Sequence, residues 1–342
     1  INNLASHYFK TGQYLKAEPL YIQAKNIREK VLGKYHPVYA ENLSNLALLY
    51  VATEQYEKAE PLLLLNSEIV LKNLTNTFGI LSENEKGNYL NKIESIISTT
   101  NSLLHNWKNA SSATIKNNFN LQLFFKSLSL ADTRNMLELV SKSKDSITKR
   151  LFNEWKTNKT FLSKQYSVPA KNQIPNLKEA EAKTETLEKE LSRISSDFRS
   201  SQMNNRVSIQ DIQRNLQTDE VSIEFVRFRL HNTNKTDSII YAAYILSKED
   251  SVPVFVPLCE EKRLQQLLDS AGRAPQKIME SLYGTKPNGT AKTLGKAVYN
   301  LVWQPLEVYL KGTKKISYSP IGKLFGIAFH ALPSEEKEIL MD

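Results

Sequence analysis

An internal repeat with a period of 42 residues opens this chain and limits what its first part can fold into. Three segments return at that spacing: Asn-Leu-Ala at 3–5 and 45–47, Gln-Tyr at 13–14 and 55–56, and Ala-Glu-Pro-Leu at 17–20 and 59–62. Self-similarity at a fixed period indicates stacked copies of one small unit, none of which buries its apolar face alone. We therefore expect an array of helical units rather than a single globular core at this end of the chain.

The repeated residues fall on one face of two consecutive helices in each unit. Small and apolar side chains recur at steps of three and four residues, with a glycine at the turn between the helices. In the first unit these positions are Leu4, Ala5, Tyr8, Gly12, Tyr14, Ala17, Tyr21 and Ala24, and in the second they are Leu46, Ala47, Tyr50, Tyr56 and Ala59. The alanines let paired helices approach closely, and the tyrosines fill the gaps between units. We interpret these residues as packing positions rather than as ligand contacts.

This pattern resembles the tetratricopeptide repeat, in the longer variant found in kinesin light chains. The second unit departs from the first at Glu54, Leu63 and Asn66, where the first has glycine, tyrosine and alanine. The resemblance implies an α-solenoid of about two repeats in residues 1–80, which binds a protein partner or peptide through its variable concave positions. Because stable arrays usually need about three units and the chain begins at Ile1, we expect further repeats upstream.

Residues 81–205 have the spacing of long helices. Apolar or small side chains alternate steps of three and four at Leu177, Ala180, Thr184, Leu187, Leu191, Ile194 and Phe198. Such a seam is typical of a coiled coil, and it forms either a dimer zipper or a helical hairpin within one chain. The oligomeric state therefore stays open.

A basic excess lies within this helical region, where eight Lys and Arg residues between 142 and 171 outnumber Asp145 and Glu154. A stripe of this kind either attracts phosphate backbones or forms a solvated helix face. No nucleic-acid-binding motif accompanies it. We favour the solvated face and expect no direct nucleic-acid partner.

The periodicity changes after residue 206, where the sequence predicts an α/β domain. Ser208 and Asp211 have capping-box spacing at the start of a short helix that ends near Leu216. Strands are predicted at 221–230, at 239–246, at 252–258 on a sheet edge because of its prolines, and at 315–320. Helices are predicted at 264–268 and 294–310, and a turn at Gly322 leads into the segment 324–332.

Three segments of this part resemble the CHAT domain, a caspase-like module that commonly follows tetratricopeptide repeats. They are the helix and strand at 209–228, the Leu-Val-Trp-Gln-Pro-Leu segment at 301–306, and the block at 316–332. The resemblance implies that the parent protein is a caspase-like cysteine endopeptidase, of a type linked to bacterial defence. Its catalytic His and Cys are expected after Asp342, so we interpret the chain as a fragment without a catalytic residue. The alternative is a non-catalytic scaffold with a degenerate CHAT domain.

Residues within the chain that could imitate this chemistry are poor candidates. Cys259 is the only thiol, and its neighbouring glutamates should raise its pKa. His231 ends a predicted strand but lacks the glycine that follows the catalytic histidine in the family, and His330 lies on an apolar helix-like face that predicts a packed side chain. No histidine or carboxylate pair has the spacing of zinc ligands. We expect no metal and no cofactor.

The composition favours a cytoplasmic protein without a membrane span. One cysteine cannot form an internal disulfide, which fits a reducing compartment. The longest apolar run, at 239–246, is too short to cross a bilayer. The domain boundaries we predict are 1–80 for the repeats, 81–205 for the helical region with its heptad-patterned arm, and 206–342 for the first portion of the CHAT domain.

Overall fold

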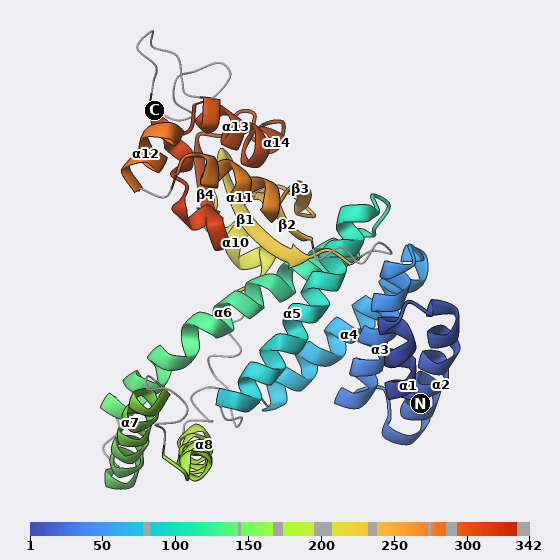
Figure 1. Ribbon diagram of the computed structural model, residues 1–342, viewed down its shortest axis with the longest axis vertical. Coiled ribbons are helices and arrows are strands. Elements are labelled where there is room, and N and C mark those ends of the chain that lie inside the picture. The colour runs from blue at the N-terminus through green and yellow to red at the C-terminus, as the bar shows by residue number, and fades with distance from the viewer. Residues whose placement is uncertain are drawn as a thin grey trace.

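A computed structural model describes residues 1–77, 83–142, 145–166, 174–194, 207–231, 238–272, 275–284 and 293–333. Helices form the lower part of the molecule and a small sheet lies on top of them (Figure 1). Most of the described residues are helical. The expectation of a helical first part followed by a strand-containing part is confirmed at this coarse level.

The first four helices form two antiparallel pairs. Helix α1 (Asn2–Lys10) packs on α2 (Tyr14–Leu32), and α3 (Pro37–Ala52) packs on α4 (Tyr56–Thr77), with α2 also against α3. Gly33 ends α2 with φ of 84°, a conformation that costs glycine little. Helix α3 then starts with Pro37 at its first position, and the Nδ1 atom of His36 accepts the Val38 N–H at 3.1 Å.

A third helix pair continues the stack. Helix α5 (Glu83–Asn106) packs on α3 and α4, and α6 (Ser112–Lys142) packs on α4 and α5. The Glu60 carboxylate of α4 accepts the Ser111 N–H at 2.7 Å and the Thr114 hydroxyl at 2.6 Å, which ties it to the first turn of α6. A shared core of buried side chains joins the second and third pairs and includes Tyr39, Leu43, Ile69, Ile93, Ile96 and Phe124.

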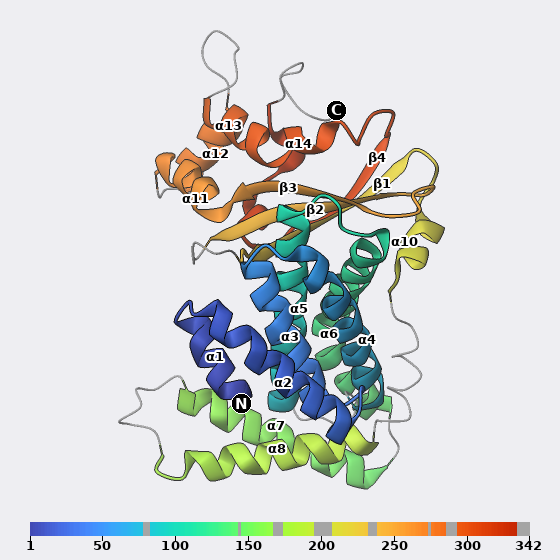
Figure 2. The same ribbon diagram turned by 90° about the vertical axis from the view of Figure 1, so that its right-hand side faces the viewer.

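The remaining two long helices form a hairpin within the chain (Figure 2). Helices α7 (Ser146–Tyr166) and α8 (Leu177–Ile194) bury the seam residues Thr184, Leu187 and Leu191. Glu188 of α8 accepts the Trp155 indole N–H at 3.1 Å and pairs with Lys159 at 2.8 Å. Of the two forms predicted for the seam, the structure has the hairpin. Phe198 of the seam lies outside the described residues.

The upper part is built on a four-stranded sheet with the order β3-β2-β1-β4. Strands β1 (Glu220–Arg229), β2 (Ile239–Ser247) and β3 (Val254–Glu260) pair antiparallel, whereas β4 (Lys315–Ser319) pairs parallel with β1. The four predicted strands are confirmed, and β3 lies at an edge as its prolines predicted. The sheet is mixed, and strands and helices do not alternate regularly along the chain. The helices between strands all belong to the crossover from β3 to β4.

Each face of this sheet packs against a different set of helices. On one face lie α11 (Glu261–Ser270), α12 (Pro275–Tyr283), α13 (Thr293–Val302) and α14 (Gln304–Glu307), with the 3-10 helices Gly322–Gly326 and Phe329–Ala331. The single helix predicted at 294–310 is wrong: it breaks at Trp303, just before Pro305. The segment that follows the predicted turn at Gly322 contains these two short 3-10 helices.

The other face of the sheet rests on α5, α6 and the short helix α10 (Ile209–Asn215), whose capping box at Ser208 and Asp211 is confirmed. Tyr244 of β2 donates its hydroxyl to Asn101 at 2.9 Å, and Asn118 donates to Tyr244 at 2.8 Å. All three side chains are buried. The core therefore continues from the first helix pair through α5 and α6 into the sheet.

Candidate functional site

A groove lies on the helix stack where the second repeat meets α5. It has a volume of about 140 Å³ and lies between α3, α4 and α5. Its walls comprise Pro37, Ala40, Glu41, Ser44, Asn45, Asn66, Val70, Asn73, Tyr89, Lys92, Ser95 and Ile96. The α3 residues recur at steps of three and four, so one face of that helix lines the groove.

Asn66 provides the groove's most distinctive group. Its side chain is 0% exposed and donates to the Ser44 hydroxyl at 2.5 Å. Its amide oxygen is buried and has no hydrogen-bond partner among the described residues. An unpaired buried carbonyl costs roughly 1–3 kcal/mol, so a partner that opens the wall of the groove at Asn66 and brings a donor to this oxygen would recover part of that loss.

Charged side chains at the groove have opposite signs. Glu41 comes from α3 and Lys92 from α5, and both are exposed. The Lys92 ammonium lies 5.9 Å from the centre of the Tyr89 ring. Asn73 donates to the Tyr35 carbonyl at 3.0 Å, which fixes the far end of α4 against the loop after α2. The groove therefore offers amides along its floor and one charge of each sign.

The residues predicted as packing positions differ in burial. In the first unit Ala5, Ala17, Tyr21 and Ala24 are buried, Tyr8, Gly12 and Tyr14 are half-buried, and Leu4 is 49% exposed. In the second unit Leu46, Ala47, Tyr50 and Ala59 are buried and Tyr56 is half-buried. None of these residues lines the groove, which instead uses the neighbouring positions of the same helices.

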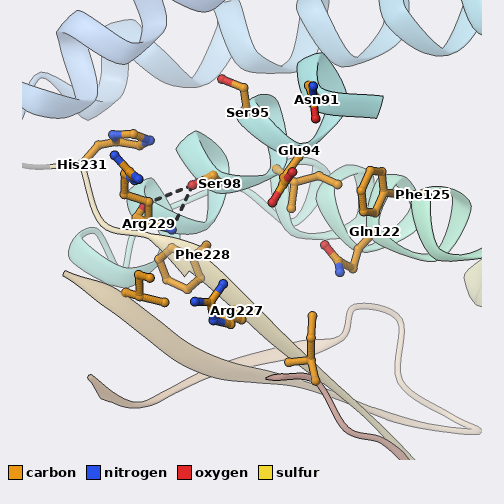
Figure 3. Close-up of a pocket in the computed structure, with 13 residues that line it drawn as sticks. Asn91, Glu94, Ser95, Ser98, Gln122, Phe125, Arg227, Phe228, Arg229 and His231 are labelled. Carbon is orange, nitrogen blue, oxygen red and sulfur yellow. Dashed lines mark hydrogen bonds between the residues drawn. The ribbon is translucent and has the colours of Figure 1, made fainter. Parts of the chain in front are cut away.

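Cys259 and His231 lie on opposite sides of the sheet. Cys259 is buried in the core beneath α11 and α13, whereas His231 lines a second cleft between α5 and the end of β1 (Figure 3). Burial raises the pKa of the Cys259 thiol to about 12, and Glu261 adds to the rise. The predicted direction is confirmed, although burial rather than the glutamates is the main cause. A thiol in this state is a poor nucleophile.

His330 is exposed, so the prediction of a packed histidine is wrong. It occupies the middle of the three-residue 3-10 helix, where Phe329 points into the core and stacks on Phe225 with ring centres 5.2 Å apart. The apolar side chains around His330 belong to the opposite side of that turn.

Sequence reasoning missed both hollows. The departure of Asn66 from the alanine of the first unit was a visible signal for the groove, because an amide at a packing position needs a polar partner. The second cleft had no such signal, since residues of α5, α6 and β1 meet there only through the fold. Within the described ranges, no three His, Cys, Asp or Glu side chains are placed to hold a metal ion.

None of the helices in the described ranges combines the length and apolar character that a membrane crossing requires.

A family model for the tetratricopeptide repeat matches residues 1–64. No curated protein matches the chain, and no solved structure matches it either. The first two helix pairs are therefore tetratricopeptide repeats.

Proposed function

We propose that this protein is a binding scaffold whose groove between α3 and α5 receives a segment of a partner protein. The unpaired, fully buried amide oxygen of Asn66 carries the proposal. An asparagine amide has one donor and one acceptor group, as a peptide bond does, so amides along a groove suit an extended main chain. Tetratricopeptide repeats generally mediate protein binding, which supports the same function.

The size of the groove favours a peptide over a small molecule. Its 140 Å³ is below the roughly 300–1,000 Å³ that ordinary ligand pockets provide. A single side chain of a longer peptide fits such a hollow, while the rest of the peptide lies along α3. Glu41 and Lys92 would then select the charges of the flanking residues.

Selection from a random peptide library tests this function. Peptides selected on the unmodified chain should bind Asn66→Ala about tenfold more weakly, because one hydrogen bond is lost. Lys92→Glu should change which peptides are selected. Lys30→Gln, on the exposed side of α2, serves as the matched control and should leave binding unchanged. Peptides that bind all four proteins equally would show that the groove is not the binding surface.

A second candidate function comes from the sheet. We infer that residues 206–342 form the first portion of a CHAT domain in a cytoplasmic, caspase-like cysteine peptidase, preceded by the repeats at 1–80 and the helical region at 81–205. Strands β1 and β4 are parallel neighbours, and the carboxyl ends of parallel strands are where such sheets place catalytic groups. Further strands would add beside β4 and supply the catalytic His and Cys.

Peptide-library cleavage by this chain and by a protein that continues past Asp342 tests the peptidase hypothesis. We expect cleavage only by the longer protein, and Cys259→Ala should not affect it. Absence of cleavage by both proteins would favour the scaffold with a degenerate CHAT domain. Cleavage by the present chain that Cys259→Ala abolishes would contradict both hypotheses.

A further inference from the structure

Helix α7 has charges of only one sign on the side that faces water. The opposite side carries the buried Thr148 and Leu162. Among the α7 side chains whose burial the structure describes, none of the exposed ones is a carboxylate. We call this exposed side the basic face of α7. Its residues are the cations Lys149, Arg150, Lys156 and Lys164, the polar residues Ser146, Asn153, Thr157, Thr160 and Ser163, and the apolar residues Ile147 and Phe161.

The carboxylates nearest to this face are already engaged within the chain. Glu154, at the border of the face, pairs with Lys183 of α8 at 2.7 Å. Asp145, just before the helix, accepts the N–H and the hydroxyl of Thr148 at 2.9 and 2.6 Å. In the described part of the chain, no carboxylate lies within ion-pair distance of Lys149, Arg150 or Lys156. The positive charge of the face is therefore left for an external partner.

The other helix of the hairpin shows what a solvated face looks like. The exposed charges of α8 have both signs: Lys178, Glu179, Lys183, Glu190 and Arg193. Interspersed signs are typical of helix surfaces that only contact water. The sequence favoured a solvated face for the whole basic segment. That interpretation fits α8, whereas the separation of charge on α7 favours a surface that binds an anion.

The uncharged residues of the basic face indicate which kind of anion fits. Phosphate groups of nucleic acids are contacted mainly by Lys and Arg together with the hydroxyls and amides of Ser, Thr and Asn. The basic face consists of these residue types apart from two apolar side chains. Ile147 and Phe161 lie seven residues on either side of Glu154 and therefore share its border position. An acidic helix would need a continuous apolar row to pack against, and the face has no such row.

The geometry of α7 favours a duplex over a single strand. Proteins that bind single strands stack the bases on several aromatic side chains. Phe161, 38% exposed, is the one aromatic residue among the exposed α7 side chains whose burial is described. From Lys149 to Lys164 the helix extends roughly 22 Å. A row of cations of this length can follow the backbone of a duplex, the form with the highest density of phosphate charge.

The position of the hairpin leaves this face accessible. Figures 1 and 2 show α7 and α8 at the end of the molecule opposite the sheet. The groove between α3, α4 and α5 takes none of its walls from the hairpin. The net charge of +9 would also attract a polyanion over a distance. Binding at α7 is therefore independent of peptide binding at the groove.

We propose that the basic face of α7 binds the phosphate backbone of duplex nucleic acid without reading its base sequence. Each cation that contacts a phosphate releases a counterion, so the logarithm of the affinity falls linearly with the logarithm of the salt concentration. Four cations predict a slope of about −3 to −4. Backbone contacts carry no sequence information, so duplexes of different sequence should bind with Kd values within about twofold of one another.

Fluorescence anisotropy of a labelled DNA duplex of about 20 base pairs, titrated with the full chain from about 50 to 200 mM salt, tests the proposal. We expect saturation with a micromolar Kd at the lowest salt concentration. Lys149→Gln combined with Lys156→Gln should reduce the steepness of the salt dependence by about two and weaken binding about tenfold or more at low salt. Both residues are exposed, so the thermal midpoint should stay the same.

A matched control removes the same charge from the other helix. Lys178→Gln combined with Arg193→Gln, on the mixed face of α8, should keep the slope and nearly all of the affinity. Equal losses in the two double variants would show that only net charge matters and would overturn the site. Equally tight binding of polyglutamate would assign the face to an acidic protein and overturn a nucleic-acid partner. Absence of saturation by about 100 μM protein at low salt would overturn the proposal as a whole.

Discussion

The two tetratricopeptide units have almost the same turn but different surroundings. In the first, Thr11 donates to the His7 carbonyl at 3.0 Å and Gln13 donates to Thr11 at 3.1 Å. The second repeats both bonds 42 residues later, from Thr53 at 2.8 Å and Gln55 at 2.9 Å. The turn is therefore set by local sequence alone.

Side-chain packing, in contrast, differs between the units. Leu4 is 49% exposed and its equivalent Leu46 only 3%, because the second unit packs between the first unit and α5. Tyr21 donates its hydroxyl to Ser6 at 3.0 Å, whereas the equivalent positions in the second unit are both leucine. The difference teaches that the repeat motif determines the backbone, while the neighbouring helices determine how each position contributes to stability.

The largest expected contrast is between the two leucines. Leu46→Ala should lower the free energy of unfolding by about 2–5 kcal/mol, since it leaves a cavity in a closed core. Leu4→Ala should cost less than about 1 kcal/mol, because much of that side chain is already in water. Urea unfolding followed by circular dichroism measures both. Similar losses for the two variants would mean that Leu4 is covered in solution.

A smaller effect concerns the exchange of a polar pair for an apolar pair. Tyr21→Leu should cost about 1–3 kcal/mol, because it removes ring contacts and leaves Ser6 without its partner. Ser6→Leu alone should crowd the tyrosine hydroxyl at a similar cost. The double variant copies Leu48 and Leu63 of the second unit and should lose less than the sum of the singles. Additive losses in this cycle would show that the two positions are independent.

Removing glycine from the first turn and introducing it into the second should have opposite effects on the free energy of unfolding. Gly12 has φ of 78°, and Glu54, its equivalent, has φ of 60° without being glycine. Gly12→Ala should cost about 1–2 kcal/mol, the penalty of left-handed backbone. Glu54→Gly should stabilise the chain by up to about 1 kcal/mol, since relief of that strain exceeds the added entropy of the unfolded glycine. Destabilisation by Glu54→Gly would indicate that the glutamate side chain supports the turn.

Local signals allowed much of the fold to be predicted from the sequence. The capping box at Ser208 and the strand at 221–230 depend on residues adjacent in the chain, and both are confirmed. The helix predicted at 294–310 is wrong because its apolar spacing continues past Trp303, although the following proline interrupts the hydrogen-bond pattern. The spacing of apolar residues alone could not distinguish one continuous helix from two helices broken at Trp303.

The hollows could not be predicted because their walls meet only in three dimensions. Gln122 and Arg227 are 105 positions apart in the sequence, and both border the second cleft because Tyr244 and the amides of Asn101 and Asn118 hold the sheet on α5 and α6. Asn66 was visible as a departure from the repeat, but the groove that it borders is closed by α5, which lies outside the repeat pattern.

The smallest expected effect is that of Asn66→Ala, which gives the second unit the residue that the first has at Ala24. The change removes the bond to Ser44, worth about 1 kcal/mol, but it also removes a buried oxygen that lacks a partner. These two contributions oppose each other, so the free energy of unfolding should change by less than about 1 kcal/mol. Thermal and urea unfolding should therefore be nearly unaltered while peptide binding weakens. A large loss of stability would instead mean that Asn66 is a structural residue, and weaker binding by this variant would then say nothing about the groove.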